Sequence, residues 1–441
     1  MGINREQSRI TDLKNPPKVL LPSPFQQAAL FIAPRRFLAR SAERHGPVFT
    51  MRLPAFPPMV VVTDSELARE IWSATSTYEI GQLQPNLGRM LGAESLFGLD
   101  GEDHSRRRKL ITPMFHGPAM QAYQEIVVDE VDRECATWPD DGPVATLEPM
   151  MRLTLNSILR AVFGAEGDEL AELRELIPRW VRLGSLLTPL PAPPPRLRKV
   201  PPWSTIDSHR RRYDALIASL VDRTVTSRKS GGRDGVIARL LHSLPAGAAS
   251  LSPEQIADEL LGLIVAGHAS TATTLAWAFE RISRHPGVLT ALTDGALKTA
   301  DKDYRTAAIL EVQRTRPVVN FIGRHVHGPH LNLGHYRIPH GSNIVVSVDL
   351  IHSDPAAFPD PYRFNPDRFR GSAPGPAWIT YGGGARRCVG ASFAHMEIDT
   401  VLDFVLRRFA IKPTNAPDEP IRTRGMASYP GTHGLITVRR R

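Results

Sequence analysis

The chain has little cysteine, no long apolar run and no recognisable leader. Cys135 and Cys388 are its two cysteines, and they lie far apart without a CxxC pair. This excludes a disulfide framework and a cysteine zinc site, and it is typical of a reducing compartment. No apolar run reaches the roughly 18 residues of a membrane span. The amino-terminal residues mix both charge signs with prolines. We therefore expect a cytoplasmic protein without a transmembrane anchor.

Composition and charge limit the class of protein further. With 42% hydrophobic and 22% charged residues, the 441-residue chain can bury a large core. Length alone suggests about three domains, but no linker supports that division, so we expect one domain over residues 1–441. The net charge of +9 favours an acidic partner. The basic residues are dispersed and accompany no finger, RNP-like or helix-turn-helix signature, so nucleic-acid binding is not predicted.

The hydrophobic periodicity predicts a mainly helical protein with a small β-rich part. A two-stranded hairpin is expected over 48–53 and 59–63, followed by a helix that Asp64 caps. Further helices are expected at 103–115, 119–137, 147–163, 166–187, 204–228, 302–316 and 391–409, and short strands within 318–348 and at the carboxyl end. Residues 1–44 form an amino-terminal segment without a strong pattern.

Two segments depart from ordinary periodicity. Residues 188–203 contain seven prolines, which remove amide donors and cannot continue a helix. We interpret them as a surface loop between two helices rather than as a linker between domains. Residues 352–390 show almost no periodicity, and irregular stretches of this length tend to be functional.

The clearest helix is expected from Ser252 to His285. Ser252, Pro253 and Gln255 form a capping-box start, and Pro286 follows the end. The middle of this helix is apolar or small on every side. Such a helix belongs in the protein interior.

Cys388 stands in the segment YGGGARRCVG, just before the last expected helix. Glycines let a backbone approach a flat ligand and adopt positive φ, while a helix amino terminus and arginines favour a thiolate. The thiolate is a candidate metal ligand. It is also a candidate nucleophile, although no partner histidine with an orienting Asn or Asp is evident. The alternative for Cys388 is an ordinary core cysteine, which is how we interpret Cys135.

This segment resembles the haem-binding loop of cytochrome P450 enzymes, F-x-x-G-x-R-x-C-x-G. It matches at Gly384, Arg386, Cys388 and Gly390, with Tyr381 in place of the phenylalanine. The resemblance implies that Cys388 is the proximal ligand of a haem b iron, where a thiolate donates electron density that favours O–O cleavage.

Three further motifs extend the resemblance over most of the chain. Glu311 and Arg314 match the family's E-x-x-R pair, with Arg368 as the third member of a structural charge triad. His104 and Arg108 match its H-x-x-x-R helix and, with Arg324 and Arg386, are implied to bind the haem carboxylates. We expect the neighbouring side chains Arg106, Arg107 and Lys109 to point to solvent, where they meet an acidic electron donor.

The centre of the long helix resembles the family's A-G-x-(D/E)-T-(T/S), in which the helix opens beside the iron. The matching residues are Ala266, Gly267, His268, Ala269, Ser270 and Thr271. Ala269 replaces the acid and Ser270 the first threonine, so the usual proton relay is altered. Ser270 can still donate a hydrogen bond. Thr271 or His268 can hold water, or His268 can face a neighbouring helix. Three interpretations stay open: protons delivered through water and substrate, use of peroxide, or slow and poorly coupled turnover.

The resemblance implies a single-domain, mainly helical cytochrome P450 fold with haem b between the long helix and the Cys388 loop. It implies a monomeric haem-thiolate monooxygenase that acts on an apolar lipid, terpenoid, steroid or aromatic substrate. No flavin or nicotinamide fingerprint is present, so the chain has no fused reductase, and electrons are expected from a ferredoxin and its NAD(P)H-dependent reductase. The alternatives are a peroxide-driven peroxygenase and a non-catalytic haem sensor or carrier. The expected substrate pocket includes Ile264, Val318, Val319, Phe321, Ile322 and Met426.

Overall fold

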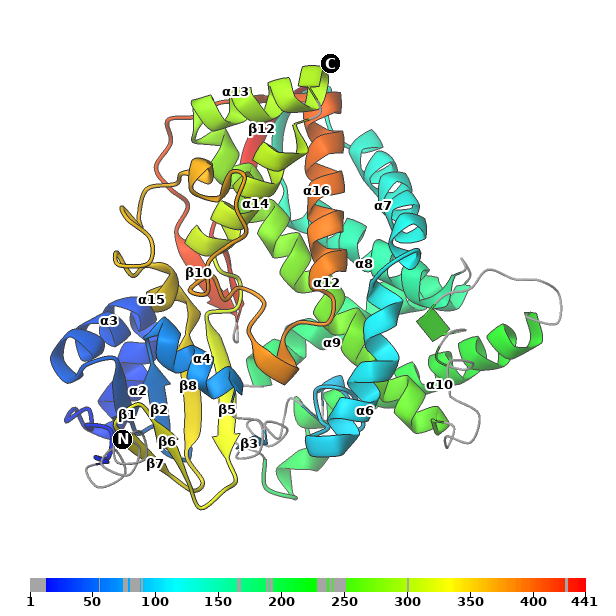
Figure 1. The fold of residues 1–441 in the computed structure, drawn as a ribbon. Coiled ribbons are helices and arrows are strands. Elements are labelled where there is room, and N and C mark those ends of the chain that lie inside the picture. Colours follow the sequence, from blue (N-terminus) through cyan, green and yellow to red (C-terminus); the bar gives the residue numbers. More distant parts are fainter. Residues whose placement is uncertain are drawn as a thin grey trace, which may run out of the picture. The chain divides into compact units, whose positions relative to one another are not determined.

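The computed structural model describes residues 13–54, 56–73, 78–79, 88, 90–164, 168–187, 190, 193–227, 236–237, 240, 251–299, 301–424 and 427–441. The chain divides into two compact units (Figure 1). Unit 1 comprises residues 1–83, 319–363 and 374–388, and unit 2 comprises residues 84–318, 364–373 and 389–441.

Unit 1 contains the predicted hairpin as part of a larger sheet. Strands β1 (Val48–Met51) and β2 (Met59–Val62) pair antiparallel, as the sequence predicts. The sheet continues through β8 (Asn343–Ser347), β5 (Phe321–Val326) and β3 (Tyr78–Glu79), in the order β1-β2-β8-β5-β3. The β2–β8 pair is parallel and the others are antiparallel. A separate hairpin joins β6 (His330–Leu333) to β7 (Tyr336–Pro339).

The helices of unit 1 are short. Helices α2 (Ser23–Ile32) and α3 (Pro34–His45) lie in the amino-terminal segment, where the sequence pattern predicts no helix. Helix α4 (Ser65–Ser73) begins as predicted, because the Leu67 amide donates to Asp64 Oδ1 at 2.8 Å. Helix α15 (Val348–His352) follows β8 directly.

Unit 2 is mainly helical, which confirms the predicted fold class for the larger part of the chain. Its helices are α6 (Gly101–Ile111), α7 (Ala119–Ala136), α8 (Leu147–Phe163), α9 (Asp168–Leu187), α10 (Trp203–Ser227), α12 (Pro253–Ser283), α13 (Pro286–Asp294), α14 (Lys302–Thr315) and α16 (Ala391–Arg408). Between α9 and α10, the described residues of the proline-rich loop are irregular apart from the 3-10 turn η2 (Leu197–Lys199).

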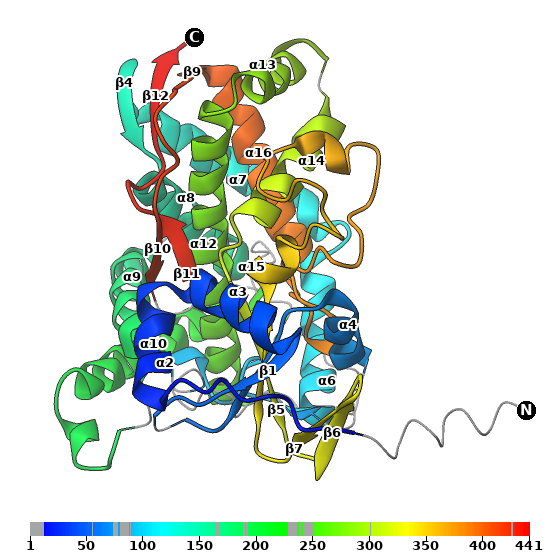
Figure 2. The ribbon, with the colours of Figure 1, turned by 90° about the vertical axis from the view of Figure 1, so that its left-hand side faces the viewer.

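Helix α12 is the central element of unit 2. Ser252 and Gln255 form the predicted capping box, and the helix packs along α8 and also contacts α10, α14 and α16 (Figure 2). By length and composition α12 could cross a membrane, but 72% of its most apolar window is buried within unit 2, as in the core helix of many globular proteins.

The carboxyl-terminal strands differ from expectation. The sequence groups them with the hairpin strands in one β-rich part, whereas they form two separate sheets in unit 2. Strand β12 (Leu435–Arg440) pairs with β4 (Asp141–Ala145) and β9 (Phe409–Lys412), and β10 (Ile421–Arg424) pairs with β11 (Ala427–Pro430). Strand β12 pairs with a strand about 300 residues earlier in the chain, and next to this pair Arg440 Nε donates to Asp140 Oδ1. A local sequence pattern does not reveal so distant a partner.

A carboxyl group is buried in the helical core of unit 2 without a hydrogen-bond partner. Glu397 on α16 is 0% exposed, and neither of its side-chain oxygens has a partner within hydrogen-bonding geometry. Burial raises the pKa of Glu397 to about 8, and the nearby Ser157 hydroxyl offsets only part of that rise. The side chain is therefore protonated at neutral pH.

This burial predicts a pH-dependent stability. Folding raises the pKa of Glu397. Its stabilising contribution to the free energy of unfolding is therefore fully present below the pKa of the unfolded state and is lost as pH rises toward about 8. Relative to Glu397→Gln, the wild-type protein should lose about 1.4 kcal/mol of unfolding free energy per pH unit over this window. Thermal unfolding midpoints between pH 5 and 9 would measure the divergence. The exposed Glu125→Gln on α7 is the control, and parallel wild-type and Glu397→Gln profiles would contradict the assignment.

Candidate functional site

The predicted charge triad is present in unit 2, with Glu311 and Arg314 buried and Arg368 half-buried. Arg314 Nε lies 2.7 Å from Glu311 Oε2, and Arg368 Nε lies 3.2 Å from the same oxygen. The Glu311 carboxylate also accepts the Asn365 amide at 2.9 Å. Glu311 and Arg314 are almost fully buried, so loss of either would leave an unpaired charge in the core. The triad fastens the turn η5 (Pro366–Phe369) to α14.

The Cys388 loop belongs to unit 1. The Cys388 amide donates to the Tyr381 carbonyl at 2.9 Å, which closes the loop around Gly382 and Gly384. These two glycines have φ values of +68° and +64°, a region that favours glycine. The Cys388 side chain is exposed, whereas Cys135 is buried, and neither cysteine forms a disulfide. The alternative of an ordinary buried cysteine at position 388 is therefore wrong.

Trp72, at the end of α4, supports this loop and was not among the predicted site residues. A Cβ atom at Gly383 would overlap the Trp72 indole, and one at Gly384 would overlap the Trp72 carbonyl. The Arg324 guanidinium lies over the same ring, 4.8 Å from its centroid, in a cation–π contact. Trp72 thus links two sequence-predicted site residues, Arg324 and Gly384. Its helical spacing in the sequence indicated packing but not its partner.

The other predicted residues of unit 1 lie along β5 and the Cys388 loop. Arg324 is buried on β5, and Arg386 is half-buried in the turn η6 (Gly384–Arg386). Ile322 Cδ1 lies within van der Waals distance of the Cβ position of Gly382. Phe321 is half-buried, and Val319 is exposed.

Helix α6 in unit 2 carries His104 and Arg108 on one face, as the four-residue spacing predicts. His104 is buried and Arg108 is half-buried. The expectation for Arg107 is wrong: Arg107 is buried, with Nη1 at 3.0 Å from Glu259 Oε2 on α12. Burial raises the pKa of Glu259 to about 7, although Arg107 acts in the opposite direction. Arg106 and Lys109 are exposed, as predicted.

One short stretch of α12 differs from the rest of the helix. From Ile256 to Ser283, every residue is buried except Val265, Ala266, Gly267, Ala269 and Ser270. Four of these five residues are small. Among these five, Ala266 is exposed and the other four are half-buried.

Helix α12 is continuous from Pro253 to Ser283, through the motif at Gly267. Gly267 has another use: a Cβ atom there would approach Ile158 Cγ1 to 3.0 Å, so its absence lets α8 pack closely. Ser270 Oγ donates to the Ala266 carbonyl at 3.0 Å, and Thr271 Oγ1 donates to the Gly267 carbonyl at 3.4 Å. Both hydroxyl protons are thereby engaged within the helix.

His268 lies on the buried side of α12. Its side chain is 3% exposed, and its Nδ1 lies 3.2 Å from the Ile264 carbonyl. Burial lowers the pKa of His268 to about 4, so the ring is neutral. This geometry favours the interpretation that His268 packs against neighbouring helices. Thr271 and the predicted pocket residue Ile264 are also buried. The predicted pocket residue Val318 is buried in the hydrophobic core of unit 2. Met426 lies outside the described residues.

These residues fit a haem with a thiolate ligand. The exposed sulfur of Cys388 forms no disulfide and lies on a glycine turn, and a soft donor of this kind suits iron. The part of α12 that is not buried consists mostly of small residues, which suit close approach of a flat group. Basic side chains that suit propionates stand on α6, β5 and η6.

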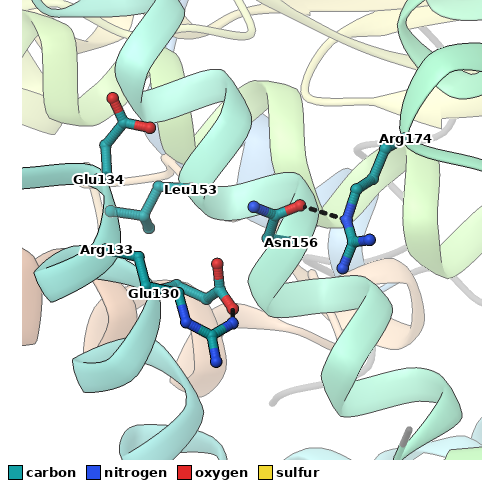
Figure 3. Close-up of a pocket in the computed structure, with 6 residues that line it drawn as sticks. All are labelled: Glu130, Arg133, Glu134, Leu153, Asn156 and Arg174. Atoms are coloured by element: carbon teal, nitrogen blue, oxygen red, sulfur yellow. Dashed lines mark hydrogen bonds and ion pairs between the residues drawn. The ribbon is translucent and has the colours of Figure 1, made fainter. Parts of the chain in front are cut away.

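A separate cavity of about 340 Å³ lies among α7, α8 and α9 (Figure 3). It is lined by Glu130, Arg133, Glu134, Leu153, Asn156 and Arg174. None of the sequence-predicted site residues is among these. Arg174 Nε donates to Asn156 Oδ1 at 2.8 Å, and Arg133 pairs with Glu130 at 3.0 Å, so the charged lining is largely paired within the protein.

Comparison with known proteins agrees with these motifs. The family model described as Cytochrome P450 matches residues 17–435. The chain belongs to the cytochrome P450 family. A protein of Mycobacterium tuberculosis provisionally named cytochrome P450 138 is 47% identical over 97% of this chain and 96% of its own length. Another from the same species, provisionally named cytochrome P450 135B1, is 33% identical over 92% of this chain and 87% of its own length.

The fold agrees as well. The solved structure of a retinoic acid-bound cyanobacterial protein, CYP120A1, superposes with a TM-score of 0.83 and covers 97% of this chain and 100% of its own, at 18% identity. This cytochrome P450 is therefore a haem-dependent monooxygenase, an oxidoreductase with iron protoporphyrin IX as its cofactor.

The contact of Trp72 with the glycine turn predicts a specific sensitivity. Gly384→Ala should disturb the Cys388 loop, because it combines a positive φ with overlap against the Trp72 carbonyl. Gly341→Ala is the matched control, since Gly341 has φ +75° and open space around its Cβ position. Both variants carry the cost of roughly 1–2 kcal/mol for a positive φ. Only Gly384→Ala should lower the fraction of holoprotein whose reduced carbon monoxide complex has the thiolate-ligated spectrum. Equal spectra would contradict this role for Trp72.

Proposed function

We propose that Cys388 is the thiolate ligand of the haem iron and that residues 1–441 form one haem domain. The observation that carries the proposal is an exposed cysteine outside any disulfide, on a glycine turn that closes between Tyr381 and Cys388. The haem supplies activation of O₂ when bound. The protein residues bind this group, orient it and admit protons and substrate.

The cationic residues are assigned to the haem carboxylates. His104, Arg108, Arg324 and Arg386 are the proposed partners, because charge-assisted hydrogen bonds to carboxylates are strong and directional. Support comes from the shared face of His104 and Arg108 on α6 and from the stacking of Arg324 on Trp72. Tyr381, Gly384, Gly390 and Ala266 are proposed to contact the porphyrin.

Electrons are proposed to come from a ferredoxin and its NAD(P)H-dependent reductase, with the enzyme a monomer in the cytoplasm. The net charge of +9 supports an acidic electron donor through long-range attraction. The exposed Arg387 beside Cys388, and Arg106 and Lys109 on α6, are candidate contacts. Salt should therefore weaken the encounter.

An apolar organic molecule is the proposed substrate. The residues of α12 that are not buried are mostly small and apolar, and Phe321 and Ile322 on β5 are half-buried apolar side chains. Val319 and Met426 complete the proposed pocket from the sequence pattern. A lipid, terpenoid, steroid or aromatic molecule has this chemistry.

Protons are proposed to pass through water and the substrate, with Ser270 Oγ accepting a hydrogen bond along this route. Ser270 is the hydroxyl-bearing residue of the unburied stretch, and its own proton is donated to Ala266. Ala269 cannot titrate, and His268 is neutral and buried. The lack of an acid in this stretch supports a second candidate, a peroxygenase, because hydrogen peroxide brings its own protons.

The ligand assignment predicts the outcome of Cys388→Ser. The purified variant should lose the thiolate-ligated spectrum of its reduced carbon monoxide complex and should no longer turn over with a surrogate ferredoxin pair. Cys135→Ser is the control and should keep both properties, because Cys135 is core. Retention of the wild-type spectrum by Cys388→Ser would overturn the proposed function.

The proton-supply proposal predicts a gain from restoring an acid. Ala269→Asp should raise the yield of oxidised product per NAD(P)H several-fold, with a ligand identified from its shift of the ferric spin state. Ala269→Asn, similar in size but unable to titrate, should give no such gain. If wild-type enzyme forms product faster with hydrogen peroxide than with the ferredoxin pair, the peroxygenase is favoured. Equal coupling in all three proteins would count against limitation by proton supply.

A further inference from the structure

Helix α2 exposes its largest apolar side chains to solvent, whereas the polar side chain of Gln26 is buried in unit 1. The exposed side chains Leu20, Phe25, Phe31 and Ile32 are 80%, 63%, 66% and 83% exposed. The buried residue of α2 is Gln26. Its amide donates to the Val19 carbonyl at 3.2 Å, and its Oε1 accepts the Arg52 amide at 3.0 Å. These hydrogen bonds fix the orientation of α2, with Phe25, Phe31 and Ile32 outward, whereas Leu30 packs against the core of unit 1.

The exposed residues form one patch rather than scattered positions. Phe25, Ala28 and Ile32 recur at intervals of three and four residues, so they share one face of α2. Figure 2 shows α2 and α3 on the outside of unit 1. Single exposed apolar residues are common, but a contiguous set on one helix marks an interaction surface.

The segment that carries this patch is basic, although one of its arginines, Arg35, is paired with Asp349 at 3.1 Å. Residues 13–42 contain Lys14, Lys18, Arg35, Arg36 and Arg40 and no Asp or Glu. Lys14, Lys18, Arg36 and Arg40 are exposed. An apolar patch flanked by basic residues complements the acyl boundary and the headgroups of an anionic bilayer.

The same chemistry recurs in unit 2, in the proline-rich loop and the end of α9. Residues 176–206 contain five basic residues and no acidic ones. Leu186, Leu190, Leu197 and Val200 are each 46–60% exposed, and Arg196, Arg198 and Lys199 beside them are exposed. This segment supports the inference independently, because it belongs to the other unit.

We infer that this protein binds peripherally to anionic membranes through the apolar and basic side chains of residues 13–42, with residues 186–200 as a second contact. Such attachment is a surface association and needs no transmembrane helix. It would bring an apolar substrate dissolved in the lipid close to the enzyme. The inference does not depend on which residue ligates iron.

Binding of the holoprotein to vesicles tests this inference. Vesicles of equimolar phosphatidylglycerol and phosphatidylcholine should co-sediment the protein, roughly tenfold or more strongly than vesicles of phosphatidylcholine alone. High salt should weaken the binding. Phe31→Glu/Ile32→Glu should lower it at least about tenfold, since both apolar anchors are lost. Val128→Glu, at an exposed apolar position on α7, is the matched control and should bind as wild type.

Charge and the second segment are tested separately. Arg36→Gln/Arg40→Gln should lower binding to the anionic vesicles and reduce its salt dependence, and Leu197→Glu/Val200→Glu should lower binding independently. The reduced carbon monoxide spectrum, measured on every variant, verifies folding and distinguishes this question from that of the iron ligand. Equal binding to both vesicle types, or no binding, would overturn the inference. The inference would also be overturned if sedimentation velocity showed a dimer that Phe31→Glu/Ile32→Glu abolishes and that lipid does not affect. The patch would then bind a second copy of the protein.

Discussion

The segment from residue 352 to residue 390 has almost no regular secondary structure, so its conformation depends on side chains from other parts of the chain. In unit 2, Glu311 holds Asn365 and Arg368 against α14. In unit 1, the Ile379 amide donates to His352 Nε2 at 2.9 Å, and Trp72 packs against Gly383 and Gly384. Few of these contacts involve residues close in sequence. A loop without its own backbone ladder can present a thiol only if such contacts fix it.

Helix α12 combines two requirements that oppose each other. A central helix gains stability from burial on all sides, whereas a helix proposed to contact a cofactor must leave one side accessible. This chain meets both, because only a short, mostly small-residue stretch around Ala266 is unburied. Gly267 faces α8 instead and permits close packing there. The same arrangement places the one histidine of the stretch, His268, in the core, where it is neutral.

Local signals in the sequence predicted much of this architecture. The capping box at Ser252, the E-x-x-R pair and the glycine-cysteine loop are all short patterns whose geometry follows from neighbouring residues. Long-range partners were not predictable in this way. Arg107 was expected in solvent, because its partner Glu259 lies on a helix far along the chain. Trp72 had helical spacing like any core residue, and the pairing of β12 with β4 joins distant segments. The family resemblance located motifs, whereas the structure identified what holds them.

The two thiols of the chain differ strongly in environment. Burial, reinforced by the Glu134 carboxylate, raises the pKa of Cys135 to about 12. A maleimide or similar reagent at neutral pH would therefore leave Cys135 unmodified. In protein stripped of its cofactor, labelling would be confined to position 388, so a fluorophore or spin label could be attached there without removing the other cysteine. With Cys388 as the proposed haem ligand, protection of that position upon reconstitution would give a direct count of occupied molecules.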